Sequence, residues 1–568
     1  MFTFLHLTLI ELGSVTGVRE GPGSINEDHV RRQQHYEDAV GEGDQAAVPL
    51  RSSLRERPAE QQSFVRLLFC QQVRALHRRR GRCFIQRRSD AHLTALQHYF
   101  SSNPTPEQIM EQSSLPFWMA LSTVRLFSRH RSPGLQVFGY ATQHSSSRAQ
   151  ESSSGPVFQY VGQHRSPTHK VFVWGFSFTG ALGIPSFVVP DSGRKKPRKY
   201  QLTPYRLETA EKISSAACGY GFTLLASSTK DVSKVWGMGL NKDSQLGFQR
   251  TQRSRNHSYH YVLEPSLVAL PLKEPLQTRV VQVACGRAHS LILTDREGVF
   301  SLGNNAYGQC GRRIVPDEVY SDSHVIHRIE GFSDRVVQVS CGQDHSLFLT
   351  ESGKVFACGW GADGQTGLGH HDVSAAPVEV GGDLSGVEVQ QVSTYGDCSL
   401  AVSRDGQLFG WGNSEYRQLS SITESTQMNS PRRLPLTGCG TVLQAACGGT
   451  QVAVLNEKGE VFVWGYGILG KGPNLSESST PELIPPTLFG RSEFSPSAPV
   501  SKIRCGLSHF AAVTEGGELF VWGKNIRGCL GIGKKDDQFF PWRVTVPGQV
   551  VDVACGVDHM VALVKSIL

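Results

Sequence analysis

Two short motifs recur along most of this chain, and no other feature constrains its fold as strongly. The first is Cys-Gly, often followed by two residues and then a His. Its glycines are Gly219, Gly286, Gly342, Gly448, Gly506 and Gly556, with a degenerate Tyr-Gly copy at Gly396. The second is an aromatic or small residue followed by Gly, and its glycines are Gly175, Gly237, Gly303, Gly359, Gly412, Gly465 and Gly523. Each series has seven members, and the first is spaced by 50 (506 to 556) to 67 (219 to 286) residues.

The motifs lie between short runs of strand-forming residues. Near the sixth copy, Phe510–Thr514 and Leu519–Trp522 flank the turn Glu515-Gly516-Gly517, a pattern that predicts a β-hairpin. An isolated hairpin is marginally stable in water, so it needs neighbours. A repeat of about 50 residues built from short strands indicates a β-propeller rather than a helical solenoid. We therefore expect an all-β, seven-bladed propeller.

The order of the motifs predicts how the ring closes. The first motif copy in the chain is a second-half one, at Val171–Gly175, and the last is a first-half one, at Cys555–Leu563. The two halves together make one blade. We therefore expect the N-terminal strands of the propeller to pair with its C-terminal strands, which leaves no long exposed sheet edge.

The recurring Cys, His and Trp residues are interpreted as architecture. A catalytic histidine is singular, whereas one per blade indicates half-buried side chains that tie neighbouring backbone together. The thiols are interpreted as small buried hydrophobes of a reducing compartment. No CxxC pattern occurs, which argues against zinc, and we expect no catalytic residue, metal or cofactor. The predicted structural residues are Cys218, Cys285, Cys341, Cys447, Cys505, Cys555, His289, His345, His509, His559, Trp174, Trp236, Trp411, Trp464 and Trp522.

Three stretches depart from the repeat or suggest another chemistry. After Trp411 both later glycines are missing, and after Trp236 there are two extra residues before Gln245, so these two blades are expected to have altered turns. Residues 465–472 have the GxxxxGK frame of a phosphate loop. They lack its Ser or Thr and lie in a blade's turn, which argues against nucleotide binding.

The motif pair CGxxH and WGxNxxGQLG resembles the regulator-of-chromosome-condensation repeat over residues 171–568. The resemblance implies a seven-bladed propeller and guanine-nucleotide exchange on a GTPase, which needs no catalytic triad. The stretches VFVWGFSFTGALGIPSFVVP (171–190) and WGYGILGKGPN (464–474) are similar to a mitochondrial subgroup of this family. That narrower resemblance implies a role in ribosome biogenesis and a link to a dynamin-like fusion GTPase of mitochondria.

The chain before the repeats divides into two parts. Residues 1–118 match no fold and are predicted to be disordered, with a basic nucleic-acid-binding arm as the alternative. Residues 119–156 are rich in Arg and Ser and contain no acid before Glu151, the composition of a mitochondrial transit peptide. Because an import signal must be N-terminal, we expect Met119 to be the natural start and residues 1–118 to be an upstream extension of the gene model. An internal basic linker is the alternative, and the propeller is expected over residues 157–568.

Insertions between motifs are the candidate binding sites, since sites on a propeller come from loops at its faces. Cations interleaved with aromatic residues suit single-stranded RNA, and solvated loops are the alternative. The candidate residues are Arg194, Lys195, Lys196, Arg198, Lys199, Arg250, Arg253, Arg255, Tyr259 and Tyr261. Residues 473–500 are rich in Pro and Ser and contain Leu488, Phe489 and Phe494, which we expect to be exposed in a protein-docking loop.

These observations favour a mitochondrial, non-hydrolytic scaffold. We expect it in the matrix or in peripheral association with the inner membrane, since no apolar run is long enough for a transmembrane helix. Its expected partners are large-subunit ribosomal RNA, ribosome-assembly proteins and a dynamin-like GTPase on which it acts as guanine-nucleotide exchange factor. The alternative is a nuclear, chromatin-binding exchange factor for a small GTPase, against which the transit-like segment argues. The net charge of +7 is compatible with an acidic partner but does not identify one.

Overall fold

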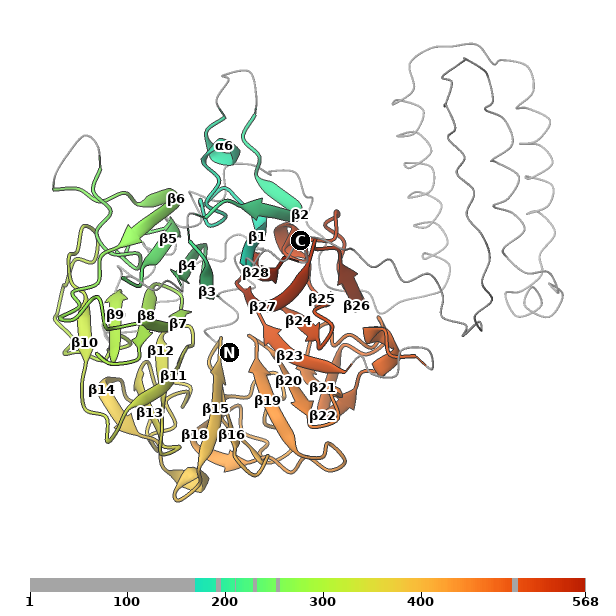
Figure 1. Ribbon diagram of the computed structural model, residues 1–568. Helices are drawn as coiled ribbons and strands as arrows, with labels where there is room; N and C mark the ends of the chain where they lie inside the picture. The colour runs from blue at the N-terminus through green and yellow to red at the C-terminus, as the bar shows by residue number, and fades with distance from the viewer. Residues whose placement is uncertain are drawn as a thin grey trace, which may run out of the picture. The chain divides into compact units, whose positions relative to one another are not determined.

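The computed structural model describes residues 169–190, 196–209, 211–227, 232–251, 256–492 and 499–566. In this part of the chain, seven four-stranded antiparallel sheets stand around one axis (Figure 1). The predicted all-β, seven-bladed propeller is therefore confirmed. The predicted disordered region and transit peptide, residues 1–156, lie outside the described residues.

Six blades are each formed by four consecutive strands. Blade 1 contains β3 (Ile213–Cys218), β4 (Phe222–Ser227), β5 (Val235–Leu240) and β6 (Tyr261–Val268), and blade 2 contains β7 (Val280–Cys285), β8 (His289–Thr294), β9 (Val299–Gly303) and β10 (His327–Ile329). Blade 3 contains β11 (Val336–Cys341), β12 (His345–Thr350), β13 (Val355–Gly359) and β14 (Ser374–Glu379), and blade 4 contains β15 (Val389–Thr394), β16 (Cys398–Ser403), β17 (Leu408–Asn413) and β18 (Gln427–Arg433). Blade 5 contains β19 (Val442–Cys447), β20 (Gln451–Asn456), β21 (Val461–Tyr466) and β22 (Glu477–Leu483), and blade 6 contains β23 (Val500–Cys505), β24 (His509–Thr514), β25 (Leu519–Gly523) and β26 (Gln538–Val544).

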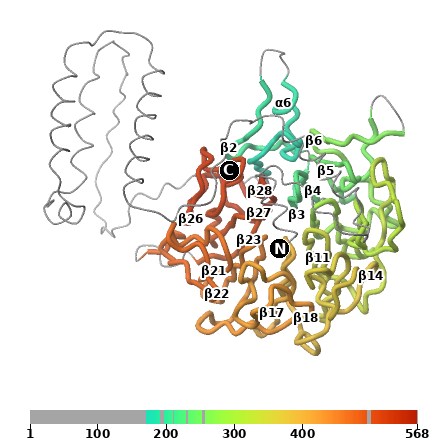
Figure 2. The backbone as a smooth tube through the Cα atoms, turned by 180° about the vertical axis from the view of Figure 1, so that it is seen from behind, coloured from blue at the N-terminus to red at the C-terminus, as the bar shows by residue number. Residues whose placement is uncertain are grey.

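The seventh sheet, the closing blade, joins both ends of the propeller. Its strands run in the order β2 (Tyr200–Leu207), β1 (His169–Phe176), β28 (His559–Lys565) and β27 (Gln549–Cys555). Along the β1–β28 pairing, Val171 lies opposite Leu563 and Gly175 opposite His559. Figure 2 shows the blue-green start of the described chain beside its red end. The prediction that the two terminal halves make one blade is confirmed.

The first strand of each blade lies next to the axis, and glutamine side chains connect several of these inner strands. Gln282 of blade 2 donates from Nε2 to Val339 O and accepts from Val339 N, both at 3.0 Å. Its side-chain amide thus makes the same two bonds with Val339 that a paired strand would make. Gln338 bonds Val392 in the same two-way manner, as does Gln391 with Ala445, and Gln444 accepts from Ile503 N. This belt satisfies inner-strand backbone groups from blade 2 round to blade 6.

In blades 4 and 5 the Trp-Gly motif fastens the blade to the one before it. Trp411 and Trp464 are buried, and each donates from Nε1 to a carbonyl in the preceding blade's loop, Gln365 O at 2.9 Å and Gln418 O at 2.8 Å. The Gly after Trp411 has φ 93°, and a Cβ there would lie 2.3 Å from Asp397 O. Only glycine fits this close approach at a positive φ.

The two blades with unusual motifs keep the ordinary first turn after the motif glycine. Ser244 (φ 54°) and Arg417 (φ 63°) adopt the left-handed conformation that Gly308 (φ 81°) and Gly364 (φ 79°) have at the same place before Gln. The altered turn expected in blade 1 is therefore not found. In blade 4, Ser420 stands where Gly367 (φ 72°) stands in blade 3 and does not have a positive φ, so the second turn there is altered as expected. Ser244 and Arg417 have a Cβ, so each carries a steric cost of about 1–2 kcal/mol in this left-handed conformation. Ser244 uses its side chain, because Oγ donates to Tyr320 O at 2.8 Å.

The strand pairing in blade 1 corrects one repeat assignment. Gly239, not Gly237, lies opposite Phe222, just as Gly303 lies opposite His289 in blade 2. Met238 therefore occupies the tryptophan position, and the assignment of Trp236 to it is wrong. Counted from Gly239, Gln245 is in the ordinary register, so the apparent two-residue insertion disappears.

Short helical turns lie in the connections: α6 (Pro185–Val188), η2 (Gly382–Leu384), η3 (Pro486–Phe489) and η4 (Ile526–Gly528). The turn η3 contradicts the predicted docking loop. Phe489 is buried, with its ring centroid 5.7 Å from those of Phe520 and Trp522. Leu488 also packs, partly buried, against this core cluster, because burying apolar surface is favourable. Phe494 lies outside the described residues.

Candidate nucleic-acid interface

Each blade directs two of its loops to one side of the ring, which we call the motif face. These loops join the first to the second strand and the third to the fourth strand, and they contain the CGxxH and WGxNxxGQLG motifs. The opposite face carries the remaining loops. The candidate loops at 194–199 and 248–261 lie between third and fourth strands, hence on the motif face.

The repeated histidines of blades 2 and 3 are buried links between blades. His289 Nε2 lies 3.0 Å from Ser346 Oγ, and that hydroxyl donates to Gln309 O, so Nε2 carries the proton. His345 contacts Ser399 in the same way at 3.0 Å. Burial lowers the pKa of His289 to about 4 and that of His345 to about 3. Both rings are therefore neutral at physiological pH. Their hydrogen bonds go to serine hydroxyls of the next blade, which is a structural role.

His559, at the same position in the closing blade, carries a charge. Thr223 donates its hydroxyl proton to Ala181 O at 2.9 Å, so His559 Nε2, 2.9 Å away, must donate to Thr223. Nδ1 lies 3.3 Å from the Asp558 carboxylate. Burial alone would lower the pKa of His559, but the Cys218 sulfur and the Asp558 carboxylate raise it to about 10. Both ring nitrogens are therefore protonated.

Asp558 also pairs with a blade 6 residue, which gives a buried charged triad across the closing seam. Arg527 Nη1 lies 2.9 Å from Asp558 Oδ2, and the Asp558 side chain is only 1% exposed. Burial opposes the charge, but His559 and Arg527 hold the pKa of Asp558 below its usual value. His509, one blade back, is buried beside the Cys529 sulfur at 3.7 Å, and burial lowers its pKa to about 4.

Three carboxyl groups, those of Asp344, Asp363 and Asp397, lie close together on the motif face near the axis. Burial together with Asp363 and Asp344 raises the pKa of Asp397 to about 7. Across the axis, the rings of Tyr220 from blade 1 and Tyr395 from blade 4 stack with centroids 6.1 Å apart. Asp344 pairs with Arg287 at 2.6 Å, so a cation neutralises one of these carboxylates.

The basic loop at 194–199 meets a second basic loop, from blade 6. Arg194 and Lys195 lie outside the described residues, whereas Lys196, Arg198 and Lys199 are exposed. The loop of blade 6 adds Lys534 and Lys535, and Lys535 Nζ lies only 3.3 Å from the ring centroid of Tyr200, the first residue of β2. The seam surface is defined here by cations and rings from both blades, namely Lys196, Arg198, Lys199, Tyr200, Lys534, Lys535 and Trp542.

Cations lie over aromatic rings throughout the seam surface. Lys534 Nζ is 5.5 Å from the Trp542 centroid, and Arg198 Cζ is 4.4 Å from that of Phe187. Arg527 Cζ is 4.5 Å from the Phe176 centroid. Such pairs contribute about 0.5–1 kcal/mol each at exposed sites. Loops from both ends of the propeller are thereby held in one composite surface.

The cations of the two faces differ in their partners. On the opposite face Arg335, Lys354 and Arg404 pair with carboxylates at 2.8–3.0 Å. Lys199 and Lys535, by contrast, have no carboxylate partner in the described part of the chain. A phosphate could therefore contact Lys199 and Lys535 without breaking an existing ion pair, whereas Lys534 lies 3.6 Å from the Asp536 carboxylate.

The second candidate loop forms a separate patch against blade 2. Arg253 and Arg255 lie outside the described residues, and Arg250 is exposed. His257 Nδ1 lies 3.2 Å from Asp322 Oδ2, which anchors the loop. Tyr259 is 41% exposed, and Lys242 Nζ lies 5.8 Å from the Tyr261 centroid. The described contacts do not join this patch to the seam surface.

Comparison with known proteins assigns the family. A family model described as "RCC1-like domain" matches residues 164–448, and models of the "Regulator of chromosome condensation (RCC1) repeat" match residues 516–563 and 500–529. The human "RCC1-like G exchanging factor-like protein" is 68% identical over 419 residues, 73% of this chain and 90% of the relative. The chain belongs to the RCC1-like family.

A solved structure and a more distant relative bear on the comparison. The crystal structure of human WBSCR16 matches with a TM-score of 0.68 and 69% identity, covering 70% of this chain and 100% of that one. The stretches at 171–190 and 464–474 resemble the regulator-of-chromosome-condensation-like protein of the Williams–Beuren region, and this match confirms that resemblance. A more distant relative from Arabidopsis thaliana, "RCC1 domain-containing protein RUG3, mitochondrial", is 28% identical over 431 residues, 70% of this chain and 89% of the relative.

The described residues give little support to nucleotide binding, reactive thiols or metal binding in this RCC1-like chain. Lys471, in the GxxxxGK frame, pairs with Glu482 at 2.5 Å, and a turn and strand follow it rather than a helix. The eleven described cysteines are free and buried, and burial raises the pKa of Cys310 to about 12. Among the described residues, no cluster of His, Cys, Asp and Glu is arranged to hold a metal ion. None of the described helices has the length and apolar character to span a membrane.

Sequence reasoning missed the blade 6 half of the seam surface. Lys534, Lys535 and Trp542 lie more than 330 residues after Lys199, and nothing local marks them as its neighbours. The predicted ring closure could have revealed these residues. A closing blade built from both chain ends must have blade 6 beside it.

Proposed function

We propose that this RCC1-like protein is a mitochondrial, non-hydrolytic scaffold that binds single-stranded segments of large-subunit ribosomal RNA during ribosome assembly. The observation that carries the proposal is the seam surface, where cations from two blades lie over aromatic rings. Phosphates are bound by such cations, and unpaired bases stack on such rings.

The organelle is proposed from two observations. Residues 119–156 have the Arg-rich, Ser-rich composition of a transit peptide, and the relative RUG3 carries "mitochondrial" in its name. We place the protein in the matrix or in peripheral association with the inner membrane, together with ribosome-assembly proteins. Fractionation of cells that express the protein would test this. Recovery with chromatin would support the nuclear alternative.

Removing three seam lysines should weaken RNA binding. In Lys199→Ala/Lys534→Ala/Lys535→Ala, we expect affinity for a ribosomal RNA fragment to fall on the order of 10- to 100-fold at low salt, because three phosphate contacts are lost. The slope of log K against log salt should fall by about 2, at ~0.7 per contact for a single strand. Fluorescence anisotropy over a salt series measures both quantities.

The matched control removes the same charge from the opposite face. Lys354→Ala/Arg404→Ala/Arg432→Ala deletes three cations that pair with Glu379, Glu388 and Asp383. We expect RNA affinity to stay within about twofold, because these cations lie on the face opposite the seam surface and already pair with carboxylates. Equal losses in the two triple variants would show that net charge alone attracts RNA and would overturn the seam as the site.

Guanine-nucleotide exchange is the second candidate, favoured by the name of the human relative, "RCC1-like G exchanging factor-like protein". An exchange factor acts by stabilising the nucleotide-free state of a GTPase, which is differential binding rather than bond chemistry. We propose a dynamin-like fusion GTPase of mitochondria as the partner. Accelerated release of labelled GDP from such a GTPase, by catalytic amounts of the purified protein, is the expected result. An unchanged release rate would remove this role.

A further inference from the structure

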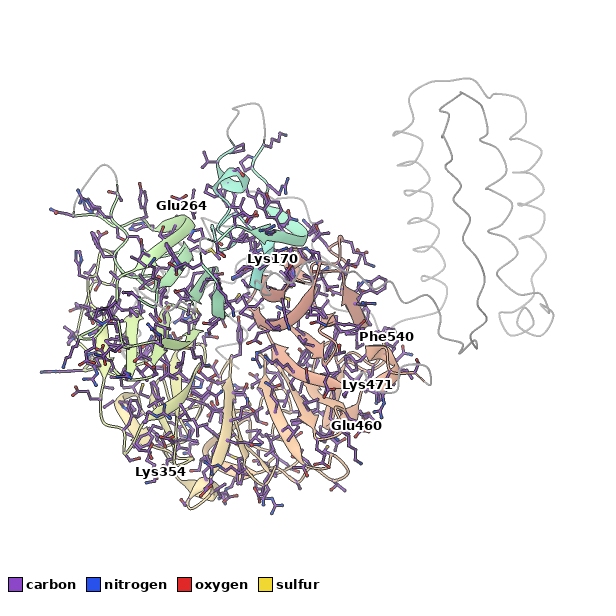
Figure 3. All side chains as sticks on the ribbon, viewed as in Figure 1. Lys170, Glu264, Lys354, Glu460, Lys471 and Phe540 are labelled. Atoms are coloured by element: carbon purple, nitrogen blue, oxygen red, sulfur yellow. The ribbon has the colours of Figure 1, made fainter. Side chains whose placement is uncertain are left out.

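Strand β26 exposes large aromatic side chains at the outer edge of blade 6. Phe540 is 47% exposed and Trp542 is 50% exposed, and both flank the buried Pro541. Figure 3 shows Phe540 on the outer side of blade 6, near Lys471 of blade 5. Exposed apolar patches beside polar residues mark interaction sites, so these rings need an explanation.

The propeller architecture does not require aromatic residues at these positions. A proline recurs in the fourth strand of five other blades, and the pairing registers place equivalent residues beside it. The place of Phe540 is taken elsewhere by Thr203, Glu264, Ala376, Ser430 and Thr480. Glu264 is labelled in Figure 3 on β6, where the same edge position carries a charge. Small or polar residues therefore satisfy this position in every other blade that has the proline.

The neighbouring blades hold the rings of β26 in place. Gly472 N of blade 5 donates to Phe539 O at 2.9 Å. A Cβ at Gly472 would lie 3.0 Å from Phe540 Cζ, so the ring packs against the glycine and leaves its other side to solvent. Trp542 lies under Lys534, as described above. The rings are thus oriented before any ligand arrives, which lowers the entropic cost of binding.

A further exposed ring lies on the neighbouring blade 5. Tyr466, at the end of β21, is 49% exposed, and its ring lies 5.9 Å from that of Tyr416 of blade 4. With Tyr200 and Trp542, the exposed or half-exposed rings extend over the closing blade, blade 6 and blade 5. The lysines Lys199, Lys534 and Lys535 lie at one end of this series.

We propose that these rings form a single-stranded RNA track that begins at the seam surface and continues over β26 to Tyr466. The proposal rests on the proposed RNA-binding function and adds the class of RNA and the path. Lysines hold phosphates at the seam, and Trp542 and Phe540 each stack on an unpaired base. A duplex has its bases already stacked, so its affinity for the track is lower.

The test uses oligo(U) and RNA duplexes with single substitutions in the full chain. Trp542→Ala and Phe540→Ala should each weaken binding of an oligo(U) 20-mer by about 5- to 150-fold, the range for loss of one stacked base. The salt slope should stay unchanged, because no charge is lost. Trp542→Phe should restore most of the affinity, and a 20-base-pair duplex should bind the wild type at least about tenfold more weakly than oligo(U).

The control is Val378→Ala, which truncates the residue at the register of Trp542 on β14 and is 47% exposed in the wild type. Its affinity should equal that of the wild type. Phe540→Leu separates stacking from protein docking, because leucine keeps an apolar surface but offers no ring. Wild-type affinity in both Phe540→Leu and Trp542→Ala would overturn the track, as would equal binding of the duplex. If the triple lysine variant lost affinity in the same series, the seam site would stand without the track.

Discussion

Asp558→Asn should destabilise the propeller by about 3–5 kcal/mol at pH 7, the usual cost of removing one partner from a buried ion pair. The carboxylate neutralises Arg527 and His559 at the seam of the closing blade, where its side chain is 1% exposed. Asparagine keeps the size but not the charge, so a buried guanidinium and imidazole lose their counter-ion. Urea denaturation followed by tryptophan fluorescence measures the change.

The effect should depend on pH with a defined sign. The pKa of His559 is raised from 6.5 to about 10, so its contribution to stability is complete below pH 6.5 and is lost as pH rises through 10. The pKa of Asp558 is lowered from 3.8, so its contribution is present above pH 3.8 and is lost as pH falls through the folded value. The difference between wild type and Asp558→Asn should therefore be larger at pH 6 than at pH 10.

Asp344→Asn is the matched control, since Asp344 precedes His345 at the same place in the repeat. Asp344 pairs with Arg287 at 2.6 Å, but burial keeps His345 neutral. This substitution leaves one buried cation without its counter-ion instead of two. The loss of stability should therefore be smaller and should not change between pH 6 and pH 10. A loss in Asp558→Asn that does not change over this range would contradict a charged His559.

Trp411→Ala should cost about 3–5 kcal/mol, the range for removing a large aromatic side chain from a packed core. Trp411 is 0% exposed, and its indole N–H donates to Gln365 O of the preceding blade at 2.9 Å. Trp411→Phe should cost less, about 1–2 kcal/mol, because Gln365 O keeps a second donor in Ser399 Oγ. Thermal and urea unfolding of the three proteins check the order.

Trp236→Ala tests the corrected register in blade 1. Trp236 lies two residues before the repeat position, opposite Leu225, and is only partly buried. Its truncation should cost no more than about half as much as that of Trp411, since less area is removed from water. Equal costs would contradict the assignment of Met238 to the tryptophan position.

The ring and its closure could be predicted from sequence because they depend on spacing and order, which the chain displays directly. The register in blade 1 could not, since Trp236-Gly237 and Met238-Gly239 differ by two residues. A shift of two keeps every side chain on the same face of a strand, so the hydrophobic pattern does not distinguish the two registers. Only the pairing with Phe222 decides between them.

The candidate interface was only half predictable for a related reason. A run of cations such as 194–199 is visible as composition, but its usefulness depends on what lies beside it in space. The packing of Phe489 was hidden as well, because a Pro- and Ser-rich stretch does not reveal that one ring reaches the core between Phe520 and Trp522. The unusual aromatic residues of β26, Phe540 and Trp542, can be recognised only when the fourth strands of the blades are aligned at their recurring proline.

The β1–β28 pairing has a consequence for biosynthesis. A nascent chain exposes β1 and β2 long before the ribosome has made β28, and a chain that crosses a membrane pore from its N-terminus does the same. During that interval both strands present unpaired backbone groups on which other chains could assemble. A premature stop codon anywhere before His559 would make this exposure permanent, although the strands that it deletes lie at the far end of the gene.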